Sequence, residues 1–188
     1  MTGLRKAVFL DRDGVVNVDK GYIYRREDFQ FLPRVPEAIG LLNKAGYLVI
    51  VVTNQSGIAR GFYTLDDVTR LHDHVDAELA HHGSRIDAYY LCPHHPDHGP
   101  DGRGGECLCR KPLPGMLLEA AADLSVDLSR SFMVGDKLSD VEAGLAAGCS
   151  PILVGGDEDG TAQDARRRGA AVCSDLMGAV ELIVGSGS

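Results

Sequence analysis

Two short runs of apolar residues constrain the fold of this chain more than any other feature of its sequence. Residues 6–10 read KAVFL and residues 47–52 read YLVIVV, with several β-branched side chains in succession. Continuous apolar strands of this kind are typical of a parallel sheet that helices cover on both faces. We therefore expect strands and helices to alternate along the chain, joined by right-handed crossovers.

The remaining segments fit that alternation. Pro36 favours a helix start, and we expect a helix from there to about Ala45, where Gly46 ends it. Thr64 is suited to cap a second helix that reaches about His82. Further strands are expected at 86–91, 131–134, 152–154 and 171–173, and further helices at 115–123, 138–147, 162–168 and 176–184. The predicted fold class is therefore α/β, a Rossmann-like, mostly parallel sheet with helices on both faces.

The length of 188 residues predicts a single domain that spans residues 1–188. Residues 18–34 mix glycine, tyrosine and charge without a helical period, which indicates a flap or a hairpin. Only 35 residues separate Asn17 from Thr53, too few for a large cap domain. The stretch 93–105 is rich in proline and glycine and should be irregular, and residues 185–188 should fray.

Bulk composition argues against several classes of protein. The formal net charge of −8 disfavours a general nucleic-acid binder, which would need a basic face. There is no apolar run of 18 residues, and the first residues lack the pattern of a signal peptide. We therefore expect a cytoplasmic protein with neither a membrane nor a nucleic acid as its partner. No apolar stripe is left unexplained, which favours a monomer.

A carboxylate loop follows the first apolar run. Asp11 and Asp13 stand in the sequence D-R-D-G, and in an extended backbone residues two apart share one face. Two close carboxylates repel each other unless a cation lies between them, and Mg²⁺ prefers such oxygen ligands. A simple turn is the alternative interpretation. A calcium-binding loop is excluded because Val15, Val16 and Val18 occupy the positions that follow.

Polar residues also follow two other expected strands and one loop. Thr53 comes directly after residues 47–52, where a hydroxyl group suits phosphate oxygens. Lys111 follows the irregular stretch and supplies a positive charge. The sequence G-D-K-L-S-D at 135–140 places Asp136 and Asp140 after a further strand. In parallel sheets ligands bind beyond the carboxyl ends of the strands, so these residues are expected to form one site.

Cysteines and histidines form a second group. Cys92 and His94 form C-x-H, and after twelve residues Cys107 and Cys109 form C-x-C. Three thiolates and one imidazole suit a closed tetrahedral Zn²⁺ site, which would pin a zinc loop at 92–110 that has no core of its own. His95 is the alternative to His94, and His98 is a third choice. Unpaired surface residues are the other interpretation, whereas Cys149 and Cys173 resemble small buried side chains.

The ordered set of strand-end residues resembles the haloacid dehalogenase (HAD) superfamily of phosphatases. Its hallmarks are D-x-D-G, a strand-end Ser or Thr, a Lys and G-D-x-x-x-D, all present here between residues 9 and 140. The resemblance implies a magnesium-dependent phosphoric monoester hydrolase. Asp11 would attack phosphorus to form an aspartyl-phosphate, and Asp13 would act as acid and then as base. Thr53 and Lys111 would complete the catalytic set by holding the phosphoryl oxygens.

The same resemblance implies the ligands of the Mg²⁺ ion. They would be Asp11, the backbone carbonyl of Asp13, and Asp136. Asp140 would orient these ligands from outside, with Lys137 nearby.

A finer resemblance is to one family of this superfamily, the D-glycero-D-manno-heptose 1,7-bisphosphate 7-phosphatases. It rests on D-R-D-G-V-V-N, T-N-Q-S-G-I-A-R-G, C-P-H-H-P, C-x-C-R-K-P and G-D-K-x-x-D, all before about residue 155. It implies removal of the C7 phosphate of a small sugar bisphosphate, which leaves heptose 1-phosphate for nucleotide-activated heptose. That product serves lipopolysaccharide core or surface-glycan biosynthesis. The implied substrate-binding residues are Asp19, Gly21, Tyr22, Thr53, Asn54, Gln55, Ser56, Arg110 and Lys111.

Arg110 suits the remote C1 phosphate, because a guanidinium group matches two phosphate oxygens. The nearest alternative is a histidinol-phosphate phosphatase, which shares the catalytic set. A non-catalytic zinc scaffold and a nucleic-acid end phosphatase are the alternatives from other classes. The first has no need of the strand-end acids, and the second conflicts with the net charge of −8.

Overall fold

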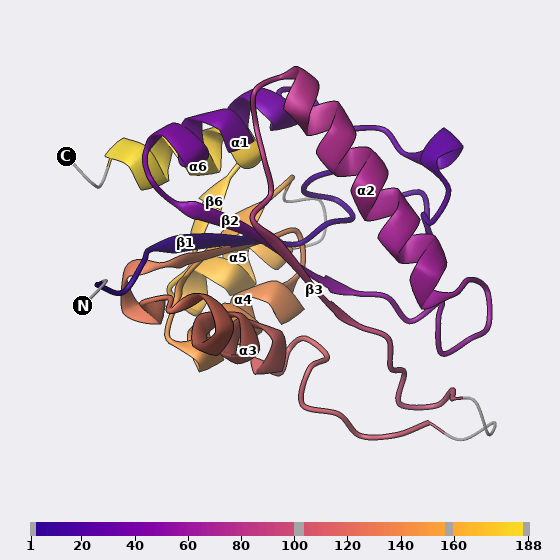
Figure 1. The fold of residues 1–188 in the computed structure, drawn as a ribbon. Coiled ribbons are helices and arrows are strands. Elements are labelled where there is room, and N and C mark those ends of the chain that lie inside the picture. The colour runs from indigo at the N-terminus through magenta and orange to yellow at the C-terminus, as the bar shows by residue number, and fades with distance from the viewer. Residues whose placement is uncertain (1–2, 100–103, 157–159, 186–188) are drawn as a thin grey trace.

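The computed structural model describes residues 3–99, 104–156 and 160–185, and these form one six-stranded sheet with helices on both sides (Figure 1). The strand order is β3-β2-β1-β4-β5-β6, and every neighbouring pair is parallel. The predicted α/β class is confirmed. The strands are Ala7–Leu10 (β1), Leu48–Asn54 (β2), Ala88–Cys92 (β3), Phe132–Gly135 (β4), Ser150–Val154 (β5) and Ala171–Cys173 (β6).

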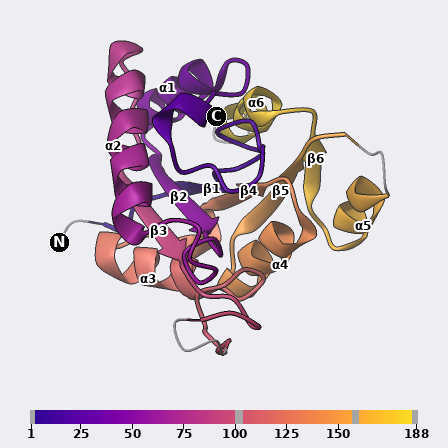
Figure 2. The same cartoon turned by 90° about the vertical axis from the view of Figure 1, so that its right-hand side faces the viewer.

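The two apolar faces of the sheet are covered by different helices. In β1, Val8 and Leu10 pack with α1 and α6, whereas Ala7 and Phe9 face α3 and α4. Figure 2 shows α1 and α6 on one side of the sheet and α3 and α4 on the other. Burial on both faces explains why the strand is apolar throughout. The helices are Val35–Lys44 (α1), Leu65–His81 (α2), Gly115–Leu124 (α3), Leu138–Ala147 (α4), Thr161–Arg167 (α5) and Leu176–Gly185 (α6).

The predicted elements are all present, and their ends differ from the predictions by no more than two residues. Thr64 caps α2 as expected: its side chain accepts from the Asp67 backbone, and the Asp67 carboxylate accepts from the backbone N–H of Thr64. Gly148 ends α4 in the left-handed conformation, at φ 88°. None of the described helices is long and apolar enough to cross a membrane.

The flap is closed at its base rather than built as a regular hairpin. An isolated antiparallel bridge joins Asn17 to Phe31, and the Val18 N–H donates to the Gln30 carbonyl at 2.9 Å. A short 3₁₀ turn at Arg26–Asp28 lies between these ends. Residues 185–188 were predicted to fray, but Gly185 is the last residue of α6, so that part of the prediction is wrong. Residues 186–188, and residues 100–103 of the irregular stretch, fall outside the described residues.

Candidate active site

A cavity of about 430 Å³ opens where β1, β2 and β4 end, beside the point at which the strand order reverses. Residues from all the predicted segments line it, together with residues that the sequence did not single out. The lining residues are Asp11, Asp13, Asp19, Gly21, Tyr22, Thr53, Asn54, Gln55, Ser56, Tyr63, Arg110, Lys111, Lys137, Ser139 and Asp140.

Three carboxylates converge beside this cavity: Asp11 and Asp140 line it, and Asp136 lines a neighbouring cavity. Asp11 follows β1, Asp136 follows β4, and Asp140 lies in the first turn of α4. Each offers one oxygen, and these oxygens lie within 4.8 Å of one another. Asp136 Oδ1 is buried and has no hydrogen-bond partner among the described residues. A hard cation with oxygen ligands would satisfy it, so this group fits Mg²⁺.

Two glycines allow the carboxylates to approach each other. A Cβ atom on Gly14 would lie 2.2 Å from Asp136 Oδ2, and Gly14 also has φ +88°. A Cβ atom on Gly135 would lie 2.1 Å from the Asp140 Cβ atom. Any side chain at either position would displace a carboxylate.

Lys111 lies between two of these acids. Its Nζ donates to Asp11 Oδ1 at 2.9 Å, to Asp140 Oδ1 at 2.7 Å and to the Val52 carbonyl at 2.8 Å. The side chain is 1% exposed, so the ammonium group depends on these three acceptors. Burial lowers the pKa of Lys111, but the charges of Asp11 and Asp140 outweigh it and raise the pKa overall. The lysine therefore stays charged and neutralises the acids beside it.

The surroundings of Asp11 and Asp136 raise the pKa values of both carboxyl groups. Burial, and secondarily the charge of Asp140, raises the pKa of Asp11, although Lys111 opposes the rise. Burial raises the pKa of Asp136 to about 6, with the Asp11 and Asp140 charges acting in the same direction. One lysine does not fully neutralise three carboxylates, and a divalent cation bound here would supply the charge that is missing.

Asp13 shares the cavity but not the cluster of three acids. Its carboxylate accepts hydrogen bonds from Arg12 at 3.0 Å, from Asn17 Nδ2 at 2.9 Å and from Gln55 Nε2 at 3.2 Å. Arg12 is almost fully buried and also donates to the Ile23 carbonyl at the start of the flap. The two acids of D-R-D-G thus lie in different surroundings, and of the two only Asp11 belongs to the cluster with Asp136 and Asp140.

The loop after β2 presents amide and hydroxyl groups. Thr53 is 1% exposed, and its Oγ1 accepts from Gln55 Nε2 at 2.8 Å. Asn54 lines the cavity, but both polar atoms of its amide bind the Lys111 backbone, each at 3.1 Å. Asn54 therefore ties this loop to the segment that carries the lysine.

The flap and α4 form the mouth of the cavity. The Gly21 N–H donates to Asp19 Oδ1 at 2.9 Å, and Asp19 Oδ2 lies 3.5 Å from Lys137 Nζ. Tyr22 has φ +52° and packs edge-on against Phe62, with ring centroids 4.8 Å apart. Both rings are about half exposed, so they form an aromatic rim at the entrance.

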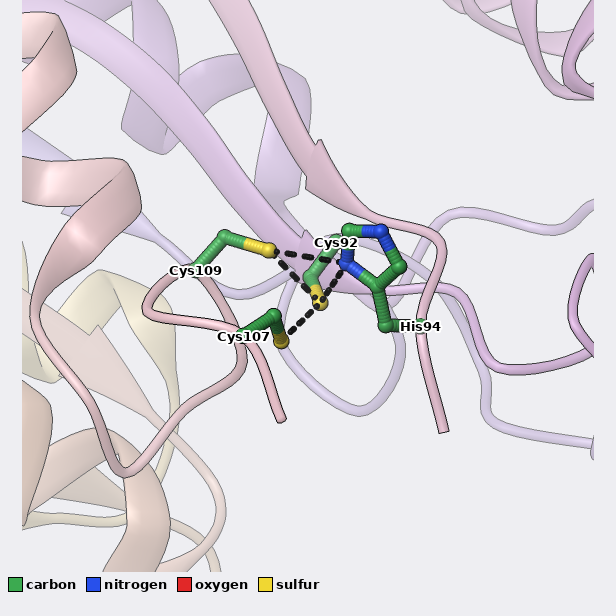
Figure 3. Close-up of side chains that lie close together, drawn as sticks. All are labelled: Cys92, His94, Cys107 and Cys109. Atoms are coloured by element: carbon green, nitrogen blue, oxygen red, sulfur yellow. Dashed lines mark hydrogen bonds between the residues drawn. The ribbon is translucent and has the colours of Figure 1, made fainter. Parts of the chain in front are cut away.

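Cys92, His94, Cys107 and Cys109 point at one another, as predicted (Figure 3). Cys92 Sγ lies 3.6 Å from Cys107 Sγ and 3.7 Å from His94 Nδ1. Cys109 Sγ lies closer, 3.0 Å from Cys92 Sγ and 3.2 Å from His94 Nδ1. Three thiols and one imidazole that meet in this way provide the four donors of a tetrahedral Zn²⁺ site. Burial, followed by the Cys109 thiol, raises the pKa of the Cys92 thiol, so a thiolate there needs a cation.

The two rival histidines bind elsewhere. His95 Nε2 and His98 Nε2 lie 2.8 Å and 2.9 Å from the two terminal nitrogens of Arg60, in the loop after β2. Arg110 Nη1 donates to the His94 carbonyl at 3.1 Å. The Arg110 bond lies within the loop at 92–110, whereas Arg60 attaches that loop to the loop after β2 at two points.

Three residues of the site were not identified from the sequence. Arg12 lies within D-R-D-G and Ser139 within G-D-K-L-S-D, so their positions inside these motifs could have identified both. Nothing in the sequence identifies Tyr63 as part of the site, because it lies between the loop after β2 and the cap of α2 and resembles an ordinary core aromatic residue.

A parallel sheet with clustered acids, a buried lysine and a hydroxyl at the carboxyl ends of its strands defines a metal-dependent phosphomonoester hydrolase of the HAD class. A family model described as HAD-hydrolase-like matches residues 108–179. The chain belongs to the D-glycero-D-manno-heptose-1,7-bisphosphate 7-phosphatase family, as the following relatives show.

The relative from Photorhabdus laumondii subsp. laumondii, a D-glycero-beta-D-manno-heptose-1,7-bisphosphate 7-phosphatase, is 50% identical over 141 residues, 75% of each chain. The Burkholderia mallei relative carries the alpha form of that name and is 48% identical over 154 residues, 82% of each chain. A crystal structure of D,D-heptose 1,7-bisphosphate phosphatase from B. bronchiseptica, complexed with magnesium and phosphate, has a TM-score of 0.81 and 37% identity. It covers 96% of this chain and 99% of its own. These relatives do not favour the histidinol-phosphate alternative.

Proposed function

We propose that this enzyme removes the C7 phosphate of D-glycero-D-manno-heptose 1,7-bisphosphate and releases heptose 1-phosphate and inorganic phosphate. The observation that carries the proposal is the convergence of Asp11, Asp136 and Asp140 beside Lys111, next to an open cavity that Asp11, Asp140 and Lys111 line. The names of the relatives supply the substrate. Arg110 lies on the same cavity and could pair with the C1 phosphate while C7 is at the acids.

In the proposed reaction Asp11 is the nucleophile. Its Oδ1 is held by the Lys111 ammonium and the Arg12 backbone N–H, so Oδ2 is the oxygen free to attack phosphorus. The new O–P bond forms as the P–O bond to C7 breaks, and the departing oxygen takes a proton from Asp13. Water then attacks the aspartyl-phosphate after giving a proton back to Asp13, which regenerates both side chains.

Asp13 must turn from its present hydrogen bonds to serve as that acid. Its side chain is 19% exposed and lines the cavity, so the movement is a local rotation. Asp11, Asp136 and the Asp13 carbonyl would hold Mg²⁺, with Asp140 and Lys137 beside them. The ion would neutralise charge on the transferred phosphoryl group.

We further propose that the cysteine and histidine cluster holds a structural Zn²⁺ ion. Closing this loop orders Arg110 and Lys111, which directly follow Cys109. All five cysteines are free, which suits the reducing cytoplasm in which we place the enzyme. We also propose a monomer, as the absence of an unexplained apolar stripe in the sequence predicts.

Phosphate release by purified protein with Mg²⁺ tests the substrate. We expect hydrolysis of one or both anomers of the heptose bisphosphate to be far faster than hydrolysis of histidinol phosphate, and the reverse ranking would overturn the substrate. Phosphorus NMR should show that the product keeps the C1 phosphate. Asp11→Asn keeps the shape of the side chain and should abolish turnover. Retained activity in that variant would refute the nucleophile.

A further inference from the structure

Tyr63 is a buried aromatic residue that none of the roles above uses. It stands between the loop after β2 and the cap of α2, and it is 6% exposed. Its ring stacks on Tyr24 of the flap, with centroids 5.0 Å apart and planes at 20°. Gly57 lies against the hydroxyl end of the Tyr63 ring, since a Cβ atom on Gly57 would be 2.2 Å from the ring carbon Cε1 and 2.7 Å from the hydroxyl oxygen. The loop and the flap therefore hold the ring in one place.

The hydroxyl group of Tyr63 reaches the amide of Gln55. It donates to Gln55 Oε1 at 2.7 Å, while Gln55 Nε2 donates to Thr53 Oγ1 at 2.8 Å and to Asp13 Oδ2 at 3.2 Å. Gln55 is only 2% exposed, so all its polar atoms are satisfied inside the protein. If the amide were flipped, its oxygen would face the Asp13 carboxylate, so one orientation is favoured.

This orientation determines which way the Thr53 hydroxyl can donate. A hydroxyl has one hydrogen and two lone pairs, and the hydrogen rotates to suit its partners. Because Gln55 fills one lone pair, the hydrogen of Thr53 is left to point to another acceptor. The cavity that Thr53 lines is where the transferred phosphoryl oxygens would lie.

We propose that Tyr63 is a positioning residue, which holds the Gln55 amide so that Thr53 presents its hydrogen to the phosphoryl group. The inference rests on the proposed function, but it concerns any phosphate ester bound at Asp11. Tyr63 itself contacts no reacting atom and acts only through Gln55.

Tyr63→Phe tests this, because it keeps the ring and its stacking and removes only the hydroxyl. Loss of one hydrogen bond to a buried acceptor that aligns a transition-state contact should lower kcat about tenfold, with KM changed less than about threefold. Tyr24→Phe is the matched control, because the Tyr24 hydroxyl makes no hydrogen bond in the described part of the chain. It should leave kcat within about twofold of the wild type.

Two further measurements separate positioning from a general structural effect. With p-nitrophenyl phosphate, which lacks the sugar, Tyr63→Phe should lose the same factor in kcat. In a Thr53→Val background, where there is no hydroxyl to position, Tyr63→Phe should cause no further loss. Thermal unfolding of each variant shows that it is folded.

Wild-type kcat in Tyr63→Phe, an effect on KM alone, or full additivity with Thr53→Val would each overturn the inference. If the wild type hydrolyses p-nitrophenyl phosphate but not the heptose bisphosphate, the proposed substrate fails while this test still stands.

Discussion

Replacing Lys111 by methionine should destabilise the protein strongly, and Mg²⁺ should restore part of the loss. The side chain is 1% exposed and its Nζ lies 2.9 Å and 2.7 Å from two buried carboxylates. Removing one partner of a buried ion pair costs about 3–5 kcal/mol, because the other charge is left unpaired. For a domain of this size each kcal/mol lowers Tm by about 2–4 °C, so a fall of about 6–20 °C is expected.

Chemical and thermal unfolding with and without Mg²⁺ measure this effect. The cation should raise the Tm of Lys111→Met by more than that of the wild type, because it meets less positive charge between Asp11 and Asp140. Lys137→Met is the matched control: that side chain is 54% exposed, its nearest acids are 3.5 Å and 3.6 Å away, and it should cost less than about 1 kcal/mol. If Lys111→Met is no less stable than this control, or if Mg²⁺ raises the Tm of Lys111→Met no more than that of the wild type, the electrostatic account of the site is wrong.

Three other perturbations follow from the structure. Gly14→Ala should push Asp136 aside, because the new Cβ atom would lie 2.2 Å from its carboxylate, and the Mg²⁺ concentration for half-maximal activity should rise at least about tenfold. Gly46→Ala is the control, because Gly46 has a similar positive φ but open space around it, and this variant should leave that concentration unchanged. If both variants change the Mg²⁺ concentration equally, the clash is not the cause. Cys109→Ser should lower the zinc content, measured by elemental analysis, and reduce kcat as the loop loosens; full activity without zinc would separate the loop from catalysis. Burial lowers the pKa of His72 from 6.5 to about 3, so the folded state binds fewer protons than the unfolded state below about pH 6.5. The contribution of His72 to the free energy of unfolding is fully present above that pH and should fall by about 1.4 kcal/mol per pH unit as the pH drops towards 3. In urea unfolding, His72→Phe should remove this dependence of the unfolding free energy on pH. If the dependence is unchanged in the variant, other groups cause it.

The zinc loop shows where prediction from sequence reached its limit. The spacing of Cys92, Cys107 and Cys109 predicted a metal site, because few other patterns place three thiols so close together. It left three candidates for the fourth ligand, His94, His95 and His98. The choice depends on Arg60, which binds two of the three rings from a loop more than thirty residues earlier in the chain.

The order of strands and helices could be predicted from the sequence, because their hydrophobic patterns are local properties of the chain. The sequence also indicated which acids and hydroxyls stand at strand ends, since the carboxyl ends of parallel strands meet at one edge. The position of Lys111 between Asp11 and Asp140, and the contact of Tyr63 with Gln55, became known only from the folded structure. Those contacts depend on how loops of irregular conformation pack, and no periodic pattern in the chain encodes where an irregular loop will lie.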